Sequence, residues 1–209
     1  MKLAVFGATG RTGRLVVEQA LAQGHQVTAF ARDPLKMPRQ DDRLRLVQGD
    51  IHEAARVAAA VAGREAVVCT LGSTRYSPKD IMEVGARHIL AAMGEHGVRR
   101  LITLTGTGVL DANDQPQLAN RAMGIWLKLV DGALVADAQR HAELIRASDR
   151  DWTIIRVTRL TDDLPLGTVR VGYVGLNTGM RITRADAASF MLKQLEDDSY
   201  LRLAPVISN

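Results

Sequence analysis

The chain opens with Met1-Lys-Leu-Ala-Val-Phe-Gly-Ala-Thr-Gly-Arg-Thr-Gly13, and this stretch decides the fold. The apolar residues 3–6 predict a buried strand, and the amphipathic residues that follow predict a helix. Between them, Gly7 permits a sharp turn, Gly10 lets the backbone approach phosphate groups, and Gly13 lets the helix pack closely on the sheet. The free N–H groups at such a helix start favour an anion. The stretch therefore predicts a site for the pyrophosphate of a dinucleotide; a tight turn without a ligand is the alternative.

Apolar strands and helical segments alternate through most of the sequence. Continuous apolar strands in such an alternation predict a parallel sheet with helices on both faces. With right-handed crossovers, this is a doubly wound α/β fold of strand order 3-2-1-4-5-6 with an extra C-terminal edge strand, and a single domain spans residues 1–209. The predicted strands are 3–6, 26–31, 44–48, 66–71, 101–105, 152–157, 169–174 and 200–203; the predicted helices are 12–22, 53–61, 81–95, 137–147 and 184–195.

The composition is that of a soluble globular protein, with 46% hydrophobic and 24% charged residues among 209. The net charge is +4, but the basic residues are dispersed and only 4% of residues are aromatic, which argues against a nucleic-acid surface. Cys69, the single cysteine, lies in an apolar run and is predicted to be a buried free thiol. We see no membrane span, no signal peptide and no metal-ligand spacing among the five histidines, so we expect a cytoplasmic protein without a metal.

The residue that ends the second predicted strand distinguishes the two nicotinamide cofactors. An acid there would accept hydrogen bonds from ribose hydroxyls and repel a 2′-phosphate, whereas an arginine matches phosphate oxygens. This strand runs into Arg32-Asp33-Pro34, and Lys36 follows. The sequence therefore favours NADP(H). Asp33 is either the ribose acid in a shifted register or a turn former before Pro34.

Asp50 follows the third predicted strand, in Gln48-Gly49-Asp50-Ile51. Its carboxylate is predicted to accept a hydrogen bond from the adenine amino group while Ile51 packs on the ring. An N-cap of the following helix is a compatible second role for Asp50.

Four motifs resemble the atypical short-chain dehydrogenases/reductases of the NmrA-like group: Phe6-Gly-Ala-Thr-Gly-Arg-Thr-Gly13, Ala31-Arg-Asp33, Gly49-Asp50 and Leu71-Gly72. Within this group, residues 71–78, 83–93 and 96–98 are similar to the biliverdin-IXβ reductases, also called flavin reductases. The resemblance covers nearly the whole chain. It implies a monomeric Rossmann-type enzyme that passes hydride from NADPH to a flat conjugated ring. The cofactor site that it implies consists of Gly7, Thr9, Gly10, Arg11, Thr12, Gly13, Arg32, Asp50, Ile51, Leu71, Gly72 and Arg75.

The chain departs from these reductases on the substrate side. After the fifth strand, Thr105-Gly-Thr-Gly108 stands where they carry Thr-Ser, and after the sixth, Arg156-Val-Thr-Arg159 replaces Pro-Pro-His. Residues 111–136 also form a longer segment. Together with residues 158–185 they are predicted to cover the substrate, with Trp126 and Arg159 as contacting residues. For residues 111–134, a packed helix with a charged outer face is the alternative.

The chain lacks the tyrosine–lysine pair with which typical short-chain dehydrogenases transfer protons, since its only tyrosines are Tyr76, Tyr173 and Tyr200. A conjugated ring does not need such an acid, because it delocalises the incoming electrons and water can protonate its nitrogens. Thr105 and Thr107 are the candidate catalytic residues, which would orient the cofactor's carboxamide or donate a hydrogen bond; satisfying the strand-end backbone is the alternative.

The sequence thus predicts an NADPH-dependent oxidoreductase with a flavin-like small-molecule substrate and no nucleic-acid or membrane partner. A non-catalytic NADP(H)-binding redox sensor of the NmrA type is the alternative. A sugar-converting or isomerase-type member is disfavoured by the missing tyrosine.

Overall fold

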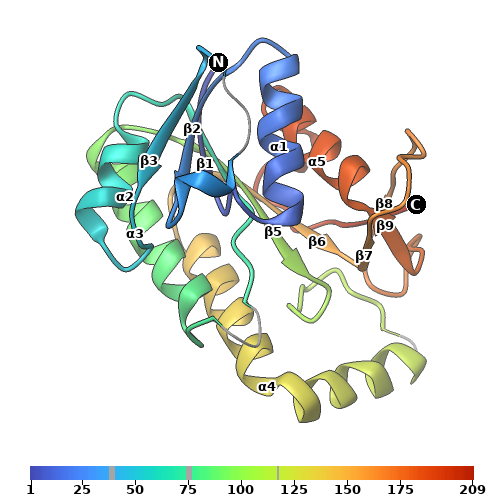
Figure 1. Ribbon diagram of the computed structural model, residues 1–209. Coiled ribbons are helices and arrows are strands. Elements are labelled where there is room, and N and C mark those ends of the chain that lie inside the picture. Colours follow the sequence, from blue (N-terminus) through green and yellow to red (C-terminus); the bar gives the residue numbers. More distant parts are fainter. Residues whose placement is uncertain (38–40, 74–76, 117) are drawn as a thin grey trace.

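The computed structural model describes residues 1–37, 41–73, 77–116 and 118–209, and for residues 118–131 it describes the helix but no side chains. The strands are β1 (Lys2–Phe6), β2 (Gln26–Ala31), β3 (Leu44–Gln48), β4 (Ala66–Cys69), β5 (Arg100–Gly106), β6 (Asp151–Val157), β7 (Arg159–Thr161), β8 (Arg170–Gly172), β9 (Arg181–Thr183) and β10 (Val206–Ser208). The helices are α1 (Arg11–Ala22), α2 (Ala54–Val61), α3 (Ile81–Glu95), α4 (Leu118–Arg146) and α5 (Arg184–Lys193) (Figure 1).

The central sheet has the order β3-β2-β1-β4-β5-β6-β10-β8, which confirms the predicted order of the first six strands. β1 to β6 and β10 pair in parallel, and β8 pairs with β10 antiparallel. β7 and β9 form a separate parallel pair. The carboxyl ends of the parallel strands therefore lie at one edge, where doubly wound sheets bind their ligands.

The predicted closing strand at residues 200–203 is wrong. Asp197 accepts a hydrogen bond from the backbone N–H of Ser199 at 2.9 Å and begins a 3-10 helix over Asp198–Tyr200. Arg202 then has a φ of 55°, which is outside the range of a strand. The last strand is β10, and it lies between β6 and β8 instead of at the edge of the sheet.

Each face of the sheet is covered by helices, α1 and α5 on one side and α2, α3 and α4 on the other (Figure 1). Successive side chains of β1 enter opposite cores: Leu3 and Val5 pack in the core that includes α1 and α5, whereas Ala4 and Phe6 pack in the core of the other helices. Burial on both faces explains why this strand is apolar at every one of these positions.

α4 is longer than predicted. The expected helix at residues 137–147 begins already at Leu118, so the interpretation of residues 111–134 as a helix is correct from that residue on. Figure 1 shows the amino-terminal part of α4 extending away from the sheet on the side where the parallel strands end. The predicted strand at residues 66–71 is shorter, because it ends at Cys69.

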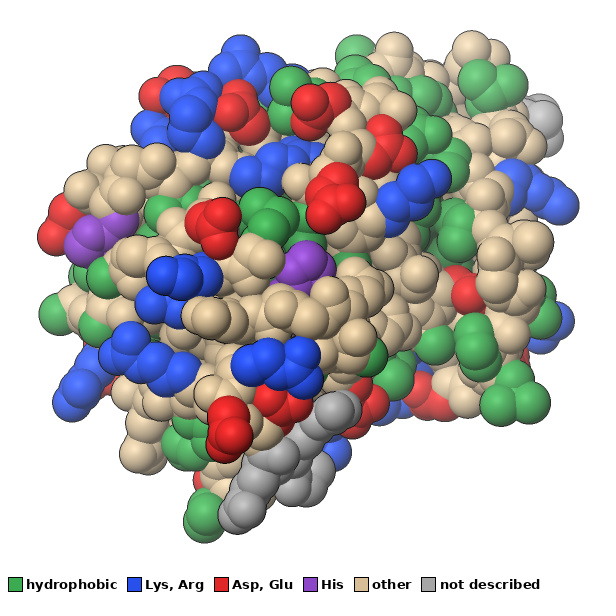
Figure 2. Space-filling model, turned by 90° about the horizontal axis from the view of Figure 1, so that it is seen from above, with side chains coloured by type: hydrophobic (Ala, Val, Ile, Leu, Met, Phe, Trp, Pro, Cys, Tyr) green, Lys and Arg blue, Asp and Glu red, His purple; other side chains and the backbone are tan. Residues whose placement is uncertain are grey.

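The molecular surface carries mixed charge. On the face seen in Figure 2, basic and acidic side chains are interspersed. Cys69 is buried and free, as predicted, and burial raises the pKa of its thiol to about 11, so it is not a ready nucleophile. Within the part of the chain that the structure describes, no helix combines the length and apolarity that a membrane crossing requires.

Candidate functional site

The glycine turn between β1 and α1 has the predicted geometry. Gly7 has a φ of +74°, which L side chains rarely adopt. Gly10 is the N-cap of α1, and its N–H donates to the Gly7 carbonyl oxygen at 2.9 Å. A Cβ on Gly13 would overlap that same oxygen, whereas a Cβ on Gly10 would approach it only to 3.1 Å. The fold itself therefore requires Gly7 and Gly13, and Gly10 is the glycine that leaves room for a ligand. Thr9 lies between them in the turn.

A cavity of about 890 Å³ opens beside this turn, at the carboxyl ends of β4, β5 and β6. Thr12 of α1 and Gly72 in the loop after β4 line one side, and the carboxyl-terminal half of α4 lines another. Residues 104–109, 157–160, 174–175 and 177–180 form most of the remaining wall. The cavity brings together Thr12, Leu71, Gly72, Thr105, Thr107 and Arg159 from the predicted site.

Ile51 and Leu71 meet on α3, at Gly85. A Cβ on Gly85 would lie 2.7 Å from Leu71 Cδ1 and 3.2 Å from Ile51 Cγ1. The glycine therefore lets two apolar side chains approach α3 closely, on the side of the sheet where an adenine ring is expected.

Asp50 is held by its neighbours in the turn after β3. Its carboxylate accepts the backbone N–H of His52 at 3.0 Å and lies 2.7 Å from His52 Nδ1. The hydrogen bond from the His52 backbone, aided by that from its ring, lowers the pKa of Asp50, and the carboxylate raises the pKa of His52. The N-cap of α2 is Glu53, so the predicted capping role of Asp50 is wrong.

Arg32 directly follows β2 and is exposed. With Arg45 and Arg56 it lines a hollow of about 620 Å³ at the ends of β2 and β3. No other described residue forms an ion pair with these three guanidinium groups. Asp33 is the turn former that one interpretation predicted, because it accepts the N–H of Leu35 at 3.1 Å at the start of a 3-10 helix.

The side chain of Arg11 reaches towards the predicted substrate side. Its Nη1 lies 3.1 Å from the Asp162 carboxylate, which also contacts Arg184 Nη1 at 2.7 Å. The glycine turn is thereby linked to the segment that follows β7. Arg75 and the side chain of Trp126, two further predicted site residues, lie outside the part that the structure describes.

Two buried polar residues of α4, missed by the sequence interpretation, anchor the cavity wall. Asp137 is fully buried and accepts the Ser73 hydroxyl at 2.7 Å and the backbone N–H of Met82 at 3.0 Å. One turn further, His141 Nδ1 donates to the Met82 carbonyl at 3.0 Å, and its Nε2 accepts from the Thr103 hydroxyl at 2.9 Å. Burial lowers the pKa of His141, which keeps the ring neutral.

A buried ion pair fixes the loops on the substrate side. The guanidinium of Arg156, fully buried, contacts both carboxylate oxygens of Asp114 at 2.7 and 2.8 Å. Asp114 also accepts the backbone N–H of Val174 at 3.0 Å, and Arg156 donates to the Val109 carbonyl at 3.0 Å. These bonds join the loop after β5 to the loop after β8, both of which line the cavity.

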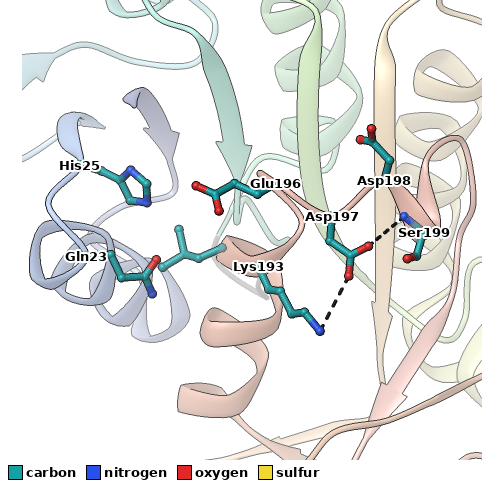
Figure 3. A pocket seen from close by; sticks show the side chains of 8 residues that line it. Gln23, His25, Lys193, Glu196, Asp197, Asp198 and Ser199 are labelled. Atoms are coloured by element: carbon teal, nitrogen blue, oxygen red, sulfur yellow. Dashed lines mark hydrogen bonds and ion pairs between the residues drawn. The ribbon is translucent and has the colours of Figure 1, made fainter.

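A separate hollow of about 610 Å³ lies near the amino end of β2, beside the last turn of α5 (Figure 3). Its polar groups are partly engaged with one another: Asp197 accepts the N–H of Ser199 and lies 3.8 Å from Lys193 Nζ. The glycine turn lies at the opposite edge of the sheet, so this hollow lies away from the predicted pyrophosphate site. Its other lining residues include Gln23, His25, Glu196 and Asp198.

The fold and the glycine turn together define a protein that binds a nicotinamide dinucleotide at the carboxyl edge of a doubly wound sheet. Residues 7–198 match the NAD(P)H-binding family, and the chain belongs to this family. The predicted class of cofactor is thereby confirmed at the level of NAD(P)H.

Two relatives of similar sequence illustrate the family. An uncharacterized chloroplast protein of Arabidopsis thaliana is 31% identical over 177 residues, which are 80% of this chain and 62% of that protein. The 3-diazoavenalumate denitrifying reductase of a Streptomyces species is 30% identical over 169 residues, which are 75% of this chain and 55% of the reductase. The chain thus spans less than two thirds of the length of these relatives.

Solved structures share the fold at low sequence identity. A short-chain dehydrogenase/reductase of Veillonella parvula in complex with NADP has a TM-score of 0.83 at 16% identity, covering 100% of this chain and 94% of its own. ChuY, an anaerobilin reductase of Escherichia coli O157:H7, has a TM-score of 0.77 at 20% identity, covering 100% and 97%.

Proposed function

We propose that this protein is an NADPH-dependent reductase that passes hydride to a flavin or a similar conjugated ring. The proposal rests on one observation, the kinds of side chain that line the cavity. The described residues that line it include no Asp, Glu, His, Lys, Tyr or Cys, and Arg159 is their one charged side chain. Such a wall suits an acceptor that does not need a protein acid.

NADPH supplies the hydride when bound, and this chain's residues position and enclose the reactants. Gly10 admits the pyrophosphate, Ile51 and Leu71 hold the adenine, and the apolar wall of the cavity encloses the ring that accepts the hydride. The proton that balances the reduction comes from water, because the described wall offers hydroxyl groups but no stronger acid.

Two similar proteins support this proposal because both are named reductases: the anaerobilin reductase, which shares the fold, and the Streptomyces reductase, which is similar in sequence. The resemblance to the NmrA-like group, and within it to the biliverdin-IXβ or flavin reductases, points to the same substrate class. A monomeric state and a cytoplasmic location remain predictions.

Turnover of NADPH with FMN is the direct test of the proposed reaction. We expect the nicotinamide absorbance to fall when the protein, NADPH and FMN are combined, and to stay constant without FMN. The assay is then repeated with biliverdin as the acceptor. If NADPH binds tightly but is not consumed with either acceptor, the result would instead favour the redox sensor.

We propose a preference for NADPH over NADH, based on the exposed guanidinium of Arg32 directly after β2. A lost charge-assisted contact to phosphate is worth about 1.5–3 kcal/mol, or roughly 10- to 150-fold in affinity. Arg32→Ala is therefore expected to weaken NADPH binding by that factor and to leave NADH binding nearly unchanged. Calorimetric titration with both cofactors measures the difference, and an equal loss for both would show that Arg32 has a structural role.

A further inference from the structure

The cavity wall carries a positive charge without a counter-charge. Arg159, the first residue of β7, lines the cavity and is exposed. No other residue that the structure describes forms an ion pair with its guanidinium. Apolar side chains, among them Leu134, Val135 and Met180, make up much of the remaining wall. A cation at the rim of an apolar cavity favours a ligand that has an anionic group beside an apolar body.

The pairing of β7 with β9 places a second arginine beside the first. The two strands are parallel, and Arg159 lies opposite Arg181 in their register. At the next position, Leu160 and Ile182 are partners, and both pack in the core that includes α1 and α5. Because side chains alternate along a strand, the two arginines lie on the other face of this pair. Like charges in register repel each other, so an anion between them would stabilise the pair.

The neighbouring carboxylates do not balance these arginines. Asp162 is shared by Arg11 and Arg184, whose Nη1 atoms lie 3.1 and 2.7 Å from it. Asp163 lies 3.8 Å from Arg181 in an exposed pair. With the arginine that begins β7, four arginines share two aspartates, which leaves an excess of two positive charges beside the cavity. Such an excess attracts an anionic ligand to the cavity mouth.

We propose that Arg159, with Arg181 beside it, binds an anionic group of the hydride acceptor at the mouth of the cavity. A guanidinium donates parallel N–H groups that match the oxygens of a phosphate or a carboxylate. The conjugated ring then lies along the apolar wall, with its charged tail at β7 and β9. Arg159 thereby selects among acceptors, since a charged acceptor binds better than a neutral one with the same ring.

This inference rests on the proposed function, in which a conjugated ring enters the cavity, and it narrows the acceptor to one with an anionic tail. Two sources supply this chemistry: the phosphate of FMN and the carboxylates of a linear tetrapyrrole such as biliverdin. Riboflavin has the ring of FMN without the phosphate, and biliverdin dimethyl ester has the tetrapyrrole without the carboxylate charges. Each pair of acceptors therefore separates the effect of the charge from that of the ring.

The test compares Arg159→Gln with the wild type in binding and in turnover. Quenching of flavin fluorescence, measured with NADP⁺ present so that no reduction occurs, gives the affinities for FMN and riboflavin. We expect the wild type to prefer FMN, and Arg159→Gln to lower the ratio of the two affinities by about 3- to 10-fold. The ratio of the kcat/KM values should fall by the same factor. Arg159→Lys, which keeps the charge but not the paired donors, should retain part of the preference.

Two controls separate this contact from the overall charge of the protein. Arg170→Gln removes the same charge from an exposed arginine of β8 that does not line the cavity, and it should leave the ratio at the wild-type value. Added salt should weaken FMN binding to the wild type more than riboflavin binding, and this difference should shrink in Arg159→Gln. The affinity for NADPH should not change in Arg159→Gln, because the phosphates of the cofactor are expected at the glycine turn and after β2.

The same variant identifies the source of the anion. A ratio that falls only for the flavin pair assigns the site to a phosphate, and one that falls only for biliverdin and its ester assigns it to a carboxylate. The proposal is overturned if Arg159→Gln leaves both ratios at wild-type values. It is also overturned if NADPH affinity falls as much as FMN affinity, because Arg159 would then contact the cofactor.

The proposed function can fail separately from this inference. If the protein binds FMN more tightly than riboflavin through Arg159 but consumes NADPH with none of the four acceptors, the anion site stands and the reductase does not. If flavins are reduced but the phosphate and the carboxylates make no difference, the reductase stands and the anion site does not. If none of the four acceptors binds, both are rejected.

Discussion

Gly10→Val is expected to abolish NADPH binding in a protein that remains folded. The branched side chain would occupy the space through which the pyrophosphate approaches the N–H groups at the start of α1. Gly10 has an ordinary extended backbone, with φ −71° and ψ 163°, which any residue can adopt. The first added carbon would lie 3.1 Å from the Gly7 carbonyl oxygen, so the turn has to move by a few tenths of an ångström to accept it. Calorimetric titration with NADPH measures the loss, and circular dichroism verifies the fold.

Gly13→Ala is the contrasting control. Its Cβ would overlap the carbonyl oxygen of Gly7, so the strand and the helix would have to move apart. We expect this variant to be less stable than the wild type, so that a change in its NADPH affinity would not report on the pyrophosphate site alone. Retained NADPH affinity in folded Gly10→Val would rule out the glycine turn as the pyrophosphate site.

Asp114→Asn is expected to lower the free energy of unfolding by about 3–5 kcal/mol, because it leaves the buried charge of Arg156 without a counter-charge. The guanidinium is 0% exposed and the Asp114 side chain 8% exposed, so water cannot replace the lost partner. The asparagine oxygen can still accept the N–H of Val174, but its amide nitrogen cannot accept the N–H of Asp111, so the loss measures the missing charge together with that hydrogen bond. Chemical denaturation of both proteins gives the difference.

The same pair makes stability depend on pH in a defined direction. Burial opposes ionisation of Asp114, but the hydrogen bond and charge of Arg156 outweigh it, and the pKa lies below its ordinary value of 3.8. A carboxyl with a lowered pKa stabilises the fold above its unfolded pKa and loses this contribution as the pH falls through the folded pKa. Wild-type stability should therefore fall more steeply in acid than that of Asp114→Asn.

An exposed ion pair provides the comparison. Lys193→Ala removes a contact of 3.8 Å to Asp197, in which the lysine side chain is 71% exposed. The expected cost is small, because solvent screens an exposed pair and both side chains lose freedom when it forms. A cost as small as this for Asp114→Asn would show that the buried pair does not hold the loops.

The fold was predictable from the sequence where a local residue pattern specifies each element and the elements follow one another in regular alternation. The apolar strand before Gly7 and the glycines after it specify β1, the turn and α1, and regular alternation then specifies the strand order. Residues 200–203 were misassigned because apolar side chains in a short loop imitate a strand. Their real conformation depends on a side-chain hydrogen bond of Asp197 and on the positive φ of Arg202.

The cofactor side was more predictable than the substrate side. The roles of the glycines and of the polar residues at strand ends follow from their immediate neighbours in the sequence. Asp137, in contrast, forms a hydrogen bond with Ser73, which is 64 positions away. No local pattern marks such a contact. Gly85, a glycine inside a predicted helix, was a usable signal for close packing that the sequence interpretation did not take up.

The polar anchors of α4 have a consequence for how the substrate preference of this scaffold can diverge. Asp137 and His141 tie one stripe of the helix to α3 and β5, and the adjacent stripe, with Leu134, Val135 and Ala138, faces the cavity. A rotation or slide of the helix would break several buried hydrogen bonds at once. Substitutions at the three apolar positions can therefore reshape the binding space while the helix stays in register, so new specificities are accessible by single changes that leave the cofactor's position intact.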